Sequence, residues 1–204
     1  MPTLKIIAGP NGAGKSTHSK GLLKDLKIEA FDLDKEFYEL WSQFSFDPSI
    51  EEGAFARVQE LYTERRSEAL RIRADFAFET NYHTRQVLAT LEMFRVQAYS
   101  LELIFICLEN VEAAIERVRD RVAKGGHSVA EAVIHERFIN GLKLLDESFY
   151  KYDRVYIYLS KYRHMDGLLV LEPPVNGITF LKAIPEAIAK YLPRLQDFVS
   201  THRR

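Results

Sequence analysis

A short run near the start of the chain has the residue types and spacing of a phosphate-binding loop. Glycines let a backbone turn tightly, so that its N–H groups can point at phosphate oxygens. The lysine near the end of the run supplies a cation for the β- and γ-phosphates, and the hydroxyl beside it supplies an oxygen ligand for Mg²⁺. The run is Gly9-Pro10-Asn11-Gly12-Ala13-Gly14-Lys15-Ser16, followed by Thr17. We expect residues 9–17 to bind a nucleotide, with Lys15 catalytic and Ser16 as the metal ligand.

The residues on either side of this loop predict the elements that would position it. Leu4–Ala8 is mostly apolar and predicts a short buried strand, and Ser16–Leu26 predicts a helix. A helix start adds unpaired N–H donors and a dipole that favours anions. Strand, glycine loop and helix are the context of the P-loop in NTPases and kinases, and they argue against a chance match in a turn.

Two acidic residues follow the second expected strand, residues 27–31. Ligands of open α/β sheets bind outside the carboxyl ends of the strands. Asp34 is therefore expected to be the general base that takes a proton from an acceptor hydroxyl, and Asp32 a substrate contact. The alternative is that these carboxylates cap the helix that follows.

The next segments are expected to form an acceptor-binding region or plain core. Residues 36–46 are rich in aromatic side chains, and residues 51–73 predict a long helix. Aromatic residues at helical spacing belong more often to a core than to a pocket. The apolar positions expected on the long helix are Phe55, Val58, Leu61, Tyr62, Ala69 and Ile72.

A third strand, residues 75–79, ends in further polar residues. Glu79, Thr80 and Asn81 come at its end and are expected to contact the substrate. A carboxylate at this position can also hold Mg²⁺ through water. The alternative for Thr80 and Asn81 is a role as a cap of the helix expected from about residue 83.

Two helices joined by a glycine break predict a mobile lid over about residues 117–140. A nearly continuous apolar strand, 101–108, precedes helix 111–123, and Ser128 is expected to cap helix 129–145. Arg121 and Arg137 are expected to neutralise charge on the transferred phosphoryl group. Arg117 could have the same role, and its alternative is a salt-bridged position on the solvated surface. For Arg119 that surface position is the expectation. His127, beside the glycines, is expected to contact the substrate.

Composition and the remaining elements predict one domain, residues 1–204, with an α/β fold. The tail predicts a strand at 155–158, an edge strand or hairpin arm at 168–171, and a closing helix at 180–199. A net charge of -1 disfavours nucleic acid as the main partner. The longest apolar run, Leu103–Leu108, is too short to span a membrane, and no signal peptide precedes the first strand. With its single cysteine, Cys107, inside that run, the chain is expected to be cytoplasmic.

Together these motifs resemble the zeta-toxin family of P-loop kinases, over about residues 3–160. The likeness rests on residues 9–16, 31–34, 76–80, 117–129 and 134–138. It implies a three-layer kinase fold with a mostly parallel sheet and a helical lid, and ATP- and Mg²⁺-dependent phosphorylation of a hydroxyl of UDP-N-acetylglucosamine. It also implies an antitoxin protein as a partner. Short members often carry an aspartate–asparagine pair where this chain has Tyr158-Leu159-Ser160.

Two alternatives stay open at this point. The first is a P-loop kinase for the hydroxyl of another sugar, a nucleoside or an antibiotic, which differs only in the acceptor. The second is a nucleotide-binding regulatory ATPase, which would bind a partner protein in a nucleotide-dependent way and phosphorylate no small molecule.

Overall fold

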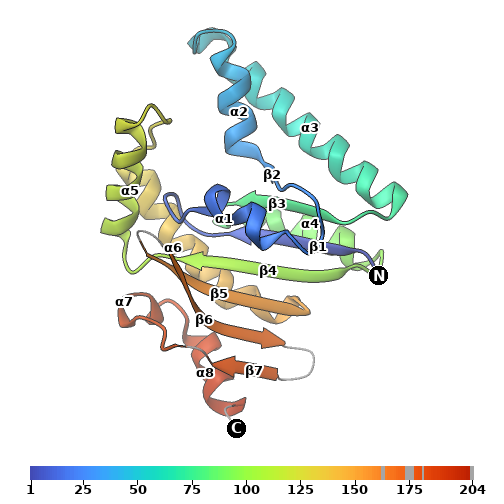
Figure 1. Ribbon diagram of the computed structural model, residues 1–204, viewed down its shortest axis with the longest axis vertical. Coiled ribbons are helices and arrows are strands. Elements are labelled where there is room, and N and C mark those ends of the chain that lie inside the picture. The colour runs from blue at the N-terminus through green and yellow to red at the C-terminus, as the bar shows by residue number, and fades with distance from the viewer. Residues whose placement is uncertain (162–163, 173–176, 181, 203–204) are drawn as a thin grey trace.

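The computed structural model describes residues 1–161, 164–172, 177–180 and 182–202. Its strands form one sheet in the order β2-β3-β1-β4-β5-β6-β7 (Figure 1). Strands β2, β3, β1, β4 and β5 are parallel, and β6 and β7 complete the sheet as antiparallel strands. Their bounds are β1 Thr3–Ala8, β2 Phe31–Asp32, β3 Phe76–Thr80, β4 Ser100–Cys107, β5 Arg154–Ser160, β6 Met165–Glu172 and β7 Gly177–Phe180.

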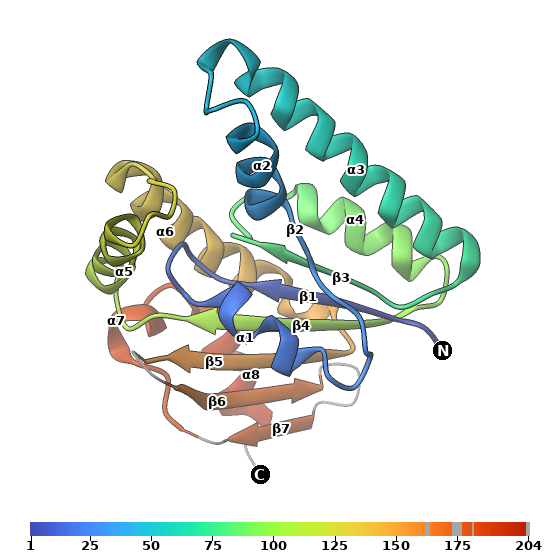
Figure 2. The same cartoon turned by 45° about the horizontal axis from the view of Figure 1, so that its top comes forward.

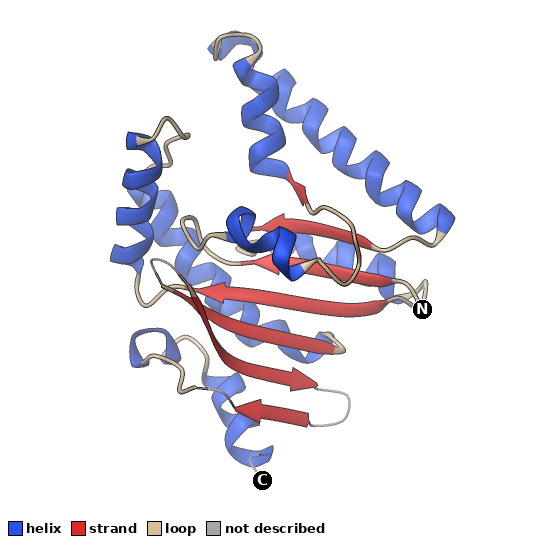
Figure 3. Ribbon diagram, viewed as in Figure 1, coloured by secondary structure: helices blue, strands red, loops and turns tan. Residues whose placement is uncertain are grey.

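The expected α/β fold is confirmed, with helices on both faces of a mostly parallel sheet. Helix α1 (Lys15–Leu22) lies on one face, and α4 (Gln86–Arg95), α6 (Glu131–Ser148) and α8 (Pro193–His202) lie on the other (Figures 1 and 3). The apolar run that predicted a central strand is β4, which stands in the middle of the sheet and is buried from Leu103 to Cys107. Burial raises the pKa of the Cys107 thiol to about 12, as befits a core residue. Among the described residues, no helix is long and apolar enough to cross a membrane.

Helices α2 (Leu33–Ser42) and α3 (Glu51–Ile72) form an arm that projects from the β2 edge of the sheet (Figure 2). A single turn of 3-10 helix, Pro48–Ile50, joins them. The long helix was predicted at 51–73 and spans Glu51–Ile72, but two of its expected apolar positions face solvent: Phe55 is 47% exposed and Ile72 54%. Phe55 is covered only in part, by the edge-on ring of Phe37 of α2 at 5.8 Å. Ile72 is the last residue of the helix, where the neighbouring Ala69 is buried and hydrogen-bonded to Tyr99 but Ile72 itself faces solvent.

Several boundaries differ from the sequence-based expectation. Helix α1 ends at Leu22, whereas the expected helix continued to residue 26. The strand expected at 27–31 is also shorter. Lys27 has a φ of 55°, which is not an extended conformation, and β2 comprises only Phe31–Asp32. Helix α6 begins at Glu131 with Ala130 as its N-cap, so the expected cap by Ser128 is wrong. The Glu131 carboxylate pairs with Arg119 of α5 (Val111–Ala123).

The closing helix is also broken into shorter elements. Its expected first residue, Phe180, is the last residue of β7, which the sequence did not predict, and helix α7 (Glu186–Ala189) precedes α8. Pro185 is the N-cap of α7, and Pro193 is the first residue of α8. Proline lacks a backbone N–H and is tolerated only at helix starts, so two prolines divide this segment. Predicted strand 168–171 is the β6 hairpin arm.

Candidate nucleotide and acceptor site

The glycine loop connects β1 to α1 at the carboxyl end of the parallel strands, between β3 and β4. The N–H of Gly9 donates to the carbonyl of Thr80 at the end of β3, 3.2 Å away. Gly9 has a φ of 147°, and a Cβ built on it would lie 2.3 Å from the carbonyl oxygen of Ile106 in β4. Gly14, with a φ of 85°, is the N-cap of α1 and opens the helix toward the cleft. The loop is therefore held between two strands in a conformation that needs glycine.

Gly9→Ala is expected to destabilise the protein by about 3 kcal/mol, since it adds backbone strain and a clash with a carbonyl that cannot move alone. Urea unfolding measures the change. Gly53→Ala is the matched control, because Gly53 lies within α3 and a Cβ added there would point into open space. That exchange should stabilise the protein by about 0.5–1 kcal/mol. Equal midpoints for the two variants would contradict the packing described for Gly9.

The ammonium of Lys15 is held by three oxygens at the base of the loop. It donates to the carbonyls of Gly9 at 2.9 Å and Pro10 at 3.2 Å, and to Oδ1 of Asn81 at 3.0 Å. Burial lowers the pKa of Lys15, and Asp34, Glu79 and Asp32 oppose that shift. These hydrogen bonds fix the cation beside the loop amides, where a phosphate chain would meet both.

Two carboxylates converge on the hydroxyl of Ser16. Oδ2 of Asp32 and Oε2 of Glu79 each lie 2.7 Å from Ser16 Oγ. The register of β2 and β3 explains the convergence, because it pairs Asp32 directly with Glu79. The hydroxyl proton of Ser16 can be donated to only one of these two carboxylates at a time. The negative charge of the other carboxylate is compensated only if it is protonated or binds a cation. Burial, and then the charge of Asp32, raise the pKa of Glu79 to about 7.

The oxygen atoms of Ser16, Asp32 and Glu79 fit a hard divalent cation such as Mg²⁺. Among the described residues no group of three His, Cys, Asp or Glu side chains could hold a metal, so a metal here would depend on the serine and on phosphate oxygens as well. Asp32 also caps α2, since its Oδ1 accepts from the N–H of Lys35 at 3.1 Å. Asp32 therefore caps α2, as the alternative stated for it proposed, and it also belongs to the cluster of oxygen atoms around Ser16.

Asn81 links the phosphate-binding lysine to the expected base. Its Oδ1 accepts from Lys15, and its Nδ2 donates to Oδ2 of Asp34 at 3.2 Å. Asn81 is only 7% exposed, and its amide makes one hydrogen bond with each of these two groups. We expected a substrate contact at Asn81, whereas the structure gives it a positioning geometry. The Thr80 hydroxyl accepts from the N–H of Tyr82 at 3.0 Å within the turn after β3. Helix α4 begins at Gln86, not near residue 83, and its N-cap is Arg85, so neither Thr80 nor Asn81 caps it.

The arginines of α5 and α6 have different surroundings. Arg117 donates to the hydroxyl of Ser160 at 2.7 Å, to its carbonyl at 3.0 Å and to the carbonyl of Gly12 at 3.3 Å. It thereby fastens α5 to the end of β5 and to the glycine loop, a role that neither alternative for it included. Arg119 forms the surface salt bridge expected of it, with Glu131.

Arg121 and Arg137 both reach the region over the loop. Nη2 of Arg121 donates to the carbonyl of His127 at 3.0 Å, which ties the helix to the glycine break. Its buried Nε has no partner within the described part of the chain. Nη1 of Arg137 lies 3.5 Å from Oδ1 of Asn11. Burial lowers the pKa of Arg121, although Asp34 and Asp32 oppose the shift, and the guanidinium stays positively charged near neutral pH.

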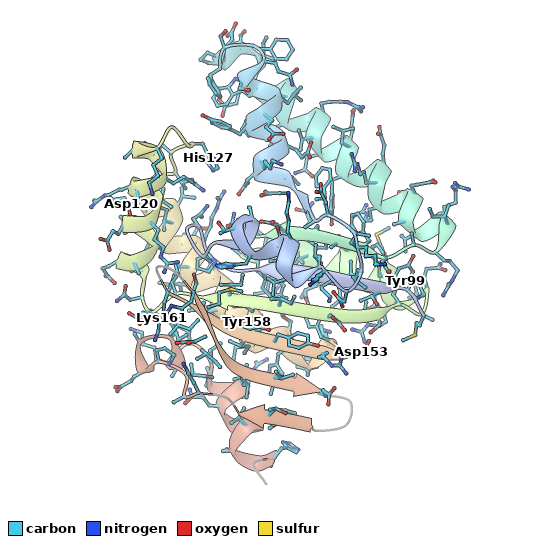
Figure 4. The ribbon with its side chains drawn as sticks, in the orientation of Figure 1. Tyr99, Asp120, His127, Asp153, Tyr158 and Lys161 are labelled. Carbon is cyan, nitrogen blue, oxygen red and sulfur yellow. The ribbon has the colours of Figure 1, made fainter. Side chains whose placement is uncertain are left out.

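One open cleft of about 730 Å³ lies above the carboxyl ends of the strands, and of the groups described above Thr80, Asn81 and Arg137 lie outside its lining. That volume lies within the range of small-molecule sites. The cleft is lined by the glycine loop and by α2 on one side and by α5 and its following loop on the other, and Figure 4 shows Asp120, His127 and Lys161 around it. The candidate residues among its lining are Asn11, Gly12, Gly14, Lys15, Ser16, Thr17, Asp32, Asp34, Glu79, Arg121 and His127.

Solved structures share this fold at low sequence identity. The structure of the PezAT toxin–antitoxin system of Streptococcus pneumoniae has a TM-score of 0.60 and 14% identity, over 99% of this chain and 87% of that chain. The AvrRxo1-ORF1:AvrRxo1-ORF2 complex with ATP has a TM-score of 0.59 and 12% identity, over 94% of this chain and 62% of that one. A candidate kinase from Chloroflexus aurantiacus has a TM-score of 0.55 and 18% identity, over 67% and 76%.

A search of curated protein sequences gave no match. A family model described as an AAA domain matches residues 4–141. The matched segment includes the glycine loop, both carboxylates of the Ser16 cluster and Arg137. The match covers more than half of the chain, and the chain belongs to this AAA domain family.

Proposed function

We propose that this protein is an ATP- and Mg²⁺-dependent kinase that phosphorylates a hydroxyl group of a small molecule. The observation that carries the proposal is the pairing of Lys15 and Asp34 through Asn81 in one cleft. A switch ATPase needs the lysine but has no need of a carboxylate held beside it at an acceptor position. A kinase needs both, one for the phosphates and one for the hydroxyl.

In the proposed mechanism, the loop amides and Lys15 hold the β- and γ-phosphates. Mg²⁺, which Ser16, Asp32 and Glu79 would hold, neutralises charge on the phosphates when bound. Asp34 orients the acceptor hydroxyl and takes its proton, and Arg121 and Arg137 approach the transferring group from the lid. Catalysis of this kind depends on positioning and electrostatics, because the loose transition state needs little covalent help.

UDP-N-acetylglucosamine is the acceptor we propose to test first. The resemblance to zeta toxins supports it. The fold shared with the PezAT toxin–antitoxin system supports a toxin role with an antitoxin partner. On this proposal the protein is a cytoplasmic toxin, an antitoxin protein is its partner, and residues 1–204 form one kinase domain with a mobile lid.

The test is ³¹P NMR of the protein with Mg-ATP and UDP-N-acetylglucosamine. A new phosphomonoester signal that is absent with Lys15→Ala would establish the transfer. ADP production without that signal would exclude this acceptor and call for other sugars, nucleosides and antibiotics. Release of inorganic phosphate alone, with all acceptors present, would contradict the kinase and favour the regulatory ATPase.

Asn81→Leu is expected to lower kcat for phosphoryl transfer by on the order of 10²-fold, because small misplacements of reacting groups have effects of this size. The affinity for ATP should fall much less, since the loop amides remain. Asn81→Asp restores an acceptor for Lys15 but places a second carboxylate beside Asp34, so it should not restore the rate. A parallel loss of ATP affinity and kcat in Asn81→Leu would mean that Asn81 only stabilises the loop.

A further inference from the structure

Helix α5 ends in a turn that folds back over Arg121. The N–H of Gly125 donates to the carbonyl of Val122 at 2.9 Å. The N–H of Gly126 donates to the carbonyl of Arg121 at 3.0 Å. With Lys124 as the C-cap and Gly125 at a φ of 87°, these two hydrogen bonds form a Schellman motif. In this motif the second residue after the cap contacts the third residue before it, so Gly126 lies against Arg121.

The loop Gly125–His127 determines the path of the Arg121 side chain. A Cβ built on Gly126 would lie 2.6 Å from Cγ and 3.2 Å from Cδ of Arg121, so the aliphatic stem passes where any other residue would have its side chain. The guanidinium is held by the next residue, since Nη2 of Arg121 donates to the carbonyl of His127 at 3.0 Å. Arg121, Gly126 and His127 all line the cleft. The position of the guanidinium in the cleft therefore depends on this loop.

Helix α2 supports this loop from the other side of the cleft. The rings of Tyr38 and His127 are in contact, with centroids 5.4 Å apart and an interplanar angle of 41°. The hydroxyl of Tyr38 also donates to the carbonyl of Gly125 at 3.4 Å. Figure 4 shows His127 on the loop that reaches toward α2. The helix that carries Asp34 is thereby joined to the loop that holds Arg121.

We infer that the Gly125–His127 loop and Tyr38 position the guanidinium of Arg121 for phosphoryl transfer. The inference rests on the proposed kinase function, in which Arg121 approaches the transferring group. A free arginine side chain samples many rotamers, and a donor stabilises developing charge best when it is fixed beforehand. The buried Nε of Arg121 has no partner within the described part of the chain, so packing against Gly126 does what hydrogen bonds alone do not. Because Asp34 and Tyr38 are four apart on α2, one helix face places the expected base and supports the arginine.

The Nε–H group of Arg121 makes this position measurable without any reaction. Its proton is expected to exchange slowly with water because Nε is buried, and NMR of ¹⁵N-labelled protein with Mg²⁺ and a non-hydrolysable ATP analogue records its signal, which Arg121→Lys removes. Gly126→Ala should raise the exchange rate about tenfold or more, because the alanine Cβ displaces the stem and opens the site to water. Tyr38→Ala should raise it as well, and Tyr38→Phe should stay near the wild type, since the ring contact is kept. Wild-type exchange in Gly126→Ala or in Tyr38→Ala, or fast exchange in the wild type itself, would overturn the inference.

Kinetics show whether the position of Arg121 matters for the reaction. ADP formation from Mg-ATP in the presence of UDP-N-acetylglucosamine is measured for Arg121→Ala, Gly126→Ala and the double variant. Arg121→Ala should lower kcat about 10²-fold and Gly126→Ala about tenfold, with the affinity for Mg-ATP within about twofold of the wild type. In the double variant the second exchange should change kcat by less than about twofold, because the group that it misplaces is gone. Equal effects of Gly126→Ala with and without Arg121 would show that it acts through the fold, which would contradict a positioning role.

Ser128→Ala and Phe44→Ala are the matched controls. Ser128 is exposed directly after the loop, and Phe44 is on the same arm as Tyr38 and 46% exposed. Both should keep wild-type exchange and kcat, and circular dichroism checks that each variant is folded. Failure of the proposed function has a different outcome: no phosphoryl transfer to any acceptor removes the kinase, while the Nε–H exchange still decides whether the loop holds Arg121. A wild-type kcat in Arg121→Ala removes the arginine from the mechanism and overturns the inference with it.

Discussion

Replacing Lys15 with alanine is expected to lower the rate of phosphoryl transfer by on the order of 10³-fold or more. The Lys15 cation lies where negative charge develops on the transferred group, and removal of one preorganised donor of this kind commonly costs about 10²–10³ in kcat. Loss of a full charge in a buried position should exceed that. Steady-state ADP production and ³¹P NMR both measure the change.

The effect on folding is expected to be small, because Lys15 carries a burial cost as well as hydrogen bonds. Burial already lowers the pKa of Lys15, which means that its charged form is disfavoured there. Alanine removes this cost and leaves two backbone carbonyls and Asn81 open to water in the cleft. Lys20→Ala on the exposed side of the same helix is the control for helix and net-charge effects. Transfer that persists in Lys15→Ala at more than about a tenth of the wild-type rate would remove the lysine from the mechanism.

The elements that carry the cleft could be predicted because their signals are local. A glycine loop after an apolar strand, and carboxylates at the ends of two further strands, follow from the pattern and from the rule that ligands bind at the carboxyl ends. That rule placed Asp32 and Glu79 correctly, and the β2–β3 register brings them together. Helices α3 and α5 were predicted almost to the residue, since their apolar periodicity is strong.

The residues that sequence reasoning assigned differently make contacts that depend on the tertiary structure. Asn81 meets Lys15 across 66 positions of chain, and Arg117 meets Ser160 across 43, so no local pattern could indicate either pair. A partial signal did exist for Arg117: Ser160 ends the segment in which this chain departs from the short zeta-toxin pattern. The wrong helix cap at Ser128 has another origin: α6 begins at Glu131 with Ala130 as its N-cap, and an alanine makes no side-chain cap that the sequence could have signalled.

Asp34→Asn is expected to lower the rate of phosphoryl transfer by about 10²–10⁴-fold, the range attributed to a positioned general base. Asparagine keeps the shape of the side chain and can still accept the hydrogen bond that Nδ2 of Asn81 now donates to Asp34. Because the link to Lys15 is kept, the affinity for Mg-ATP should stay within about twofold of the wild type, a difference below about 0.5 kcal/mol. Rapid-quench kinetics and calorimetry separate the two quantities.

The control for this exchange comes from the same turn of α2. Asp34 and Glu36 both lie in its first turn, so each favours the helix through the dipole, but only Asp34 lines the cleft. Glu36→Gln should therefore reproduce any effect on helix stability while leaving transfer at the wild-type rate. If Asp34→Asn keeps full turnover, the carboxylate is not the base, and the proposed mechanism has no residue that takes the proton of the acceptor hydroxyl. If both variants lose activity equally, the charge on α2 acts through the fold of the arm and not through the chemistry at the acceptor hydroxyl.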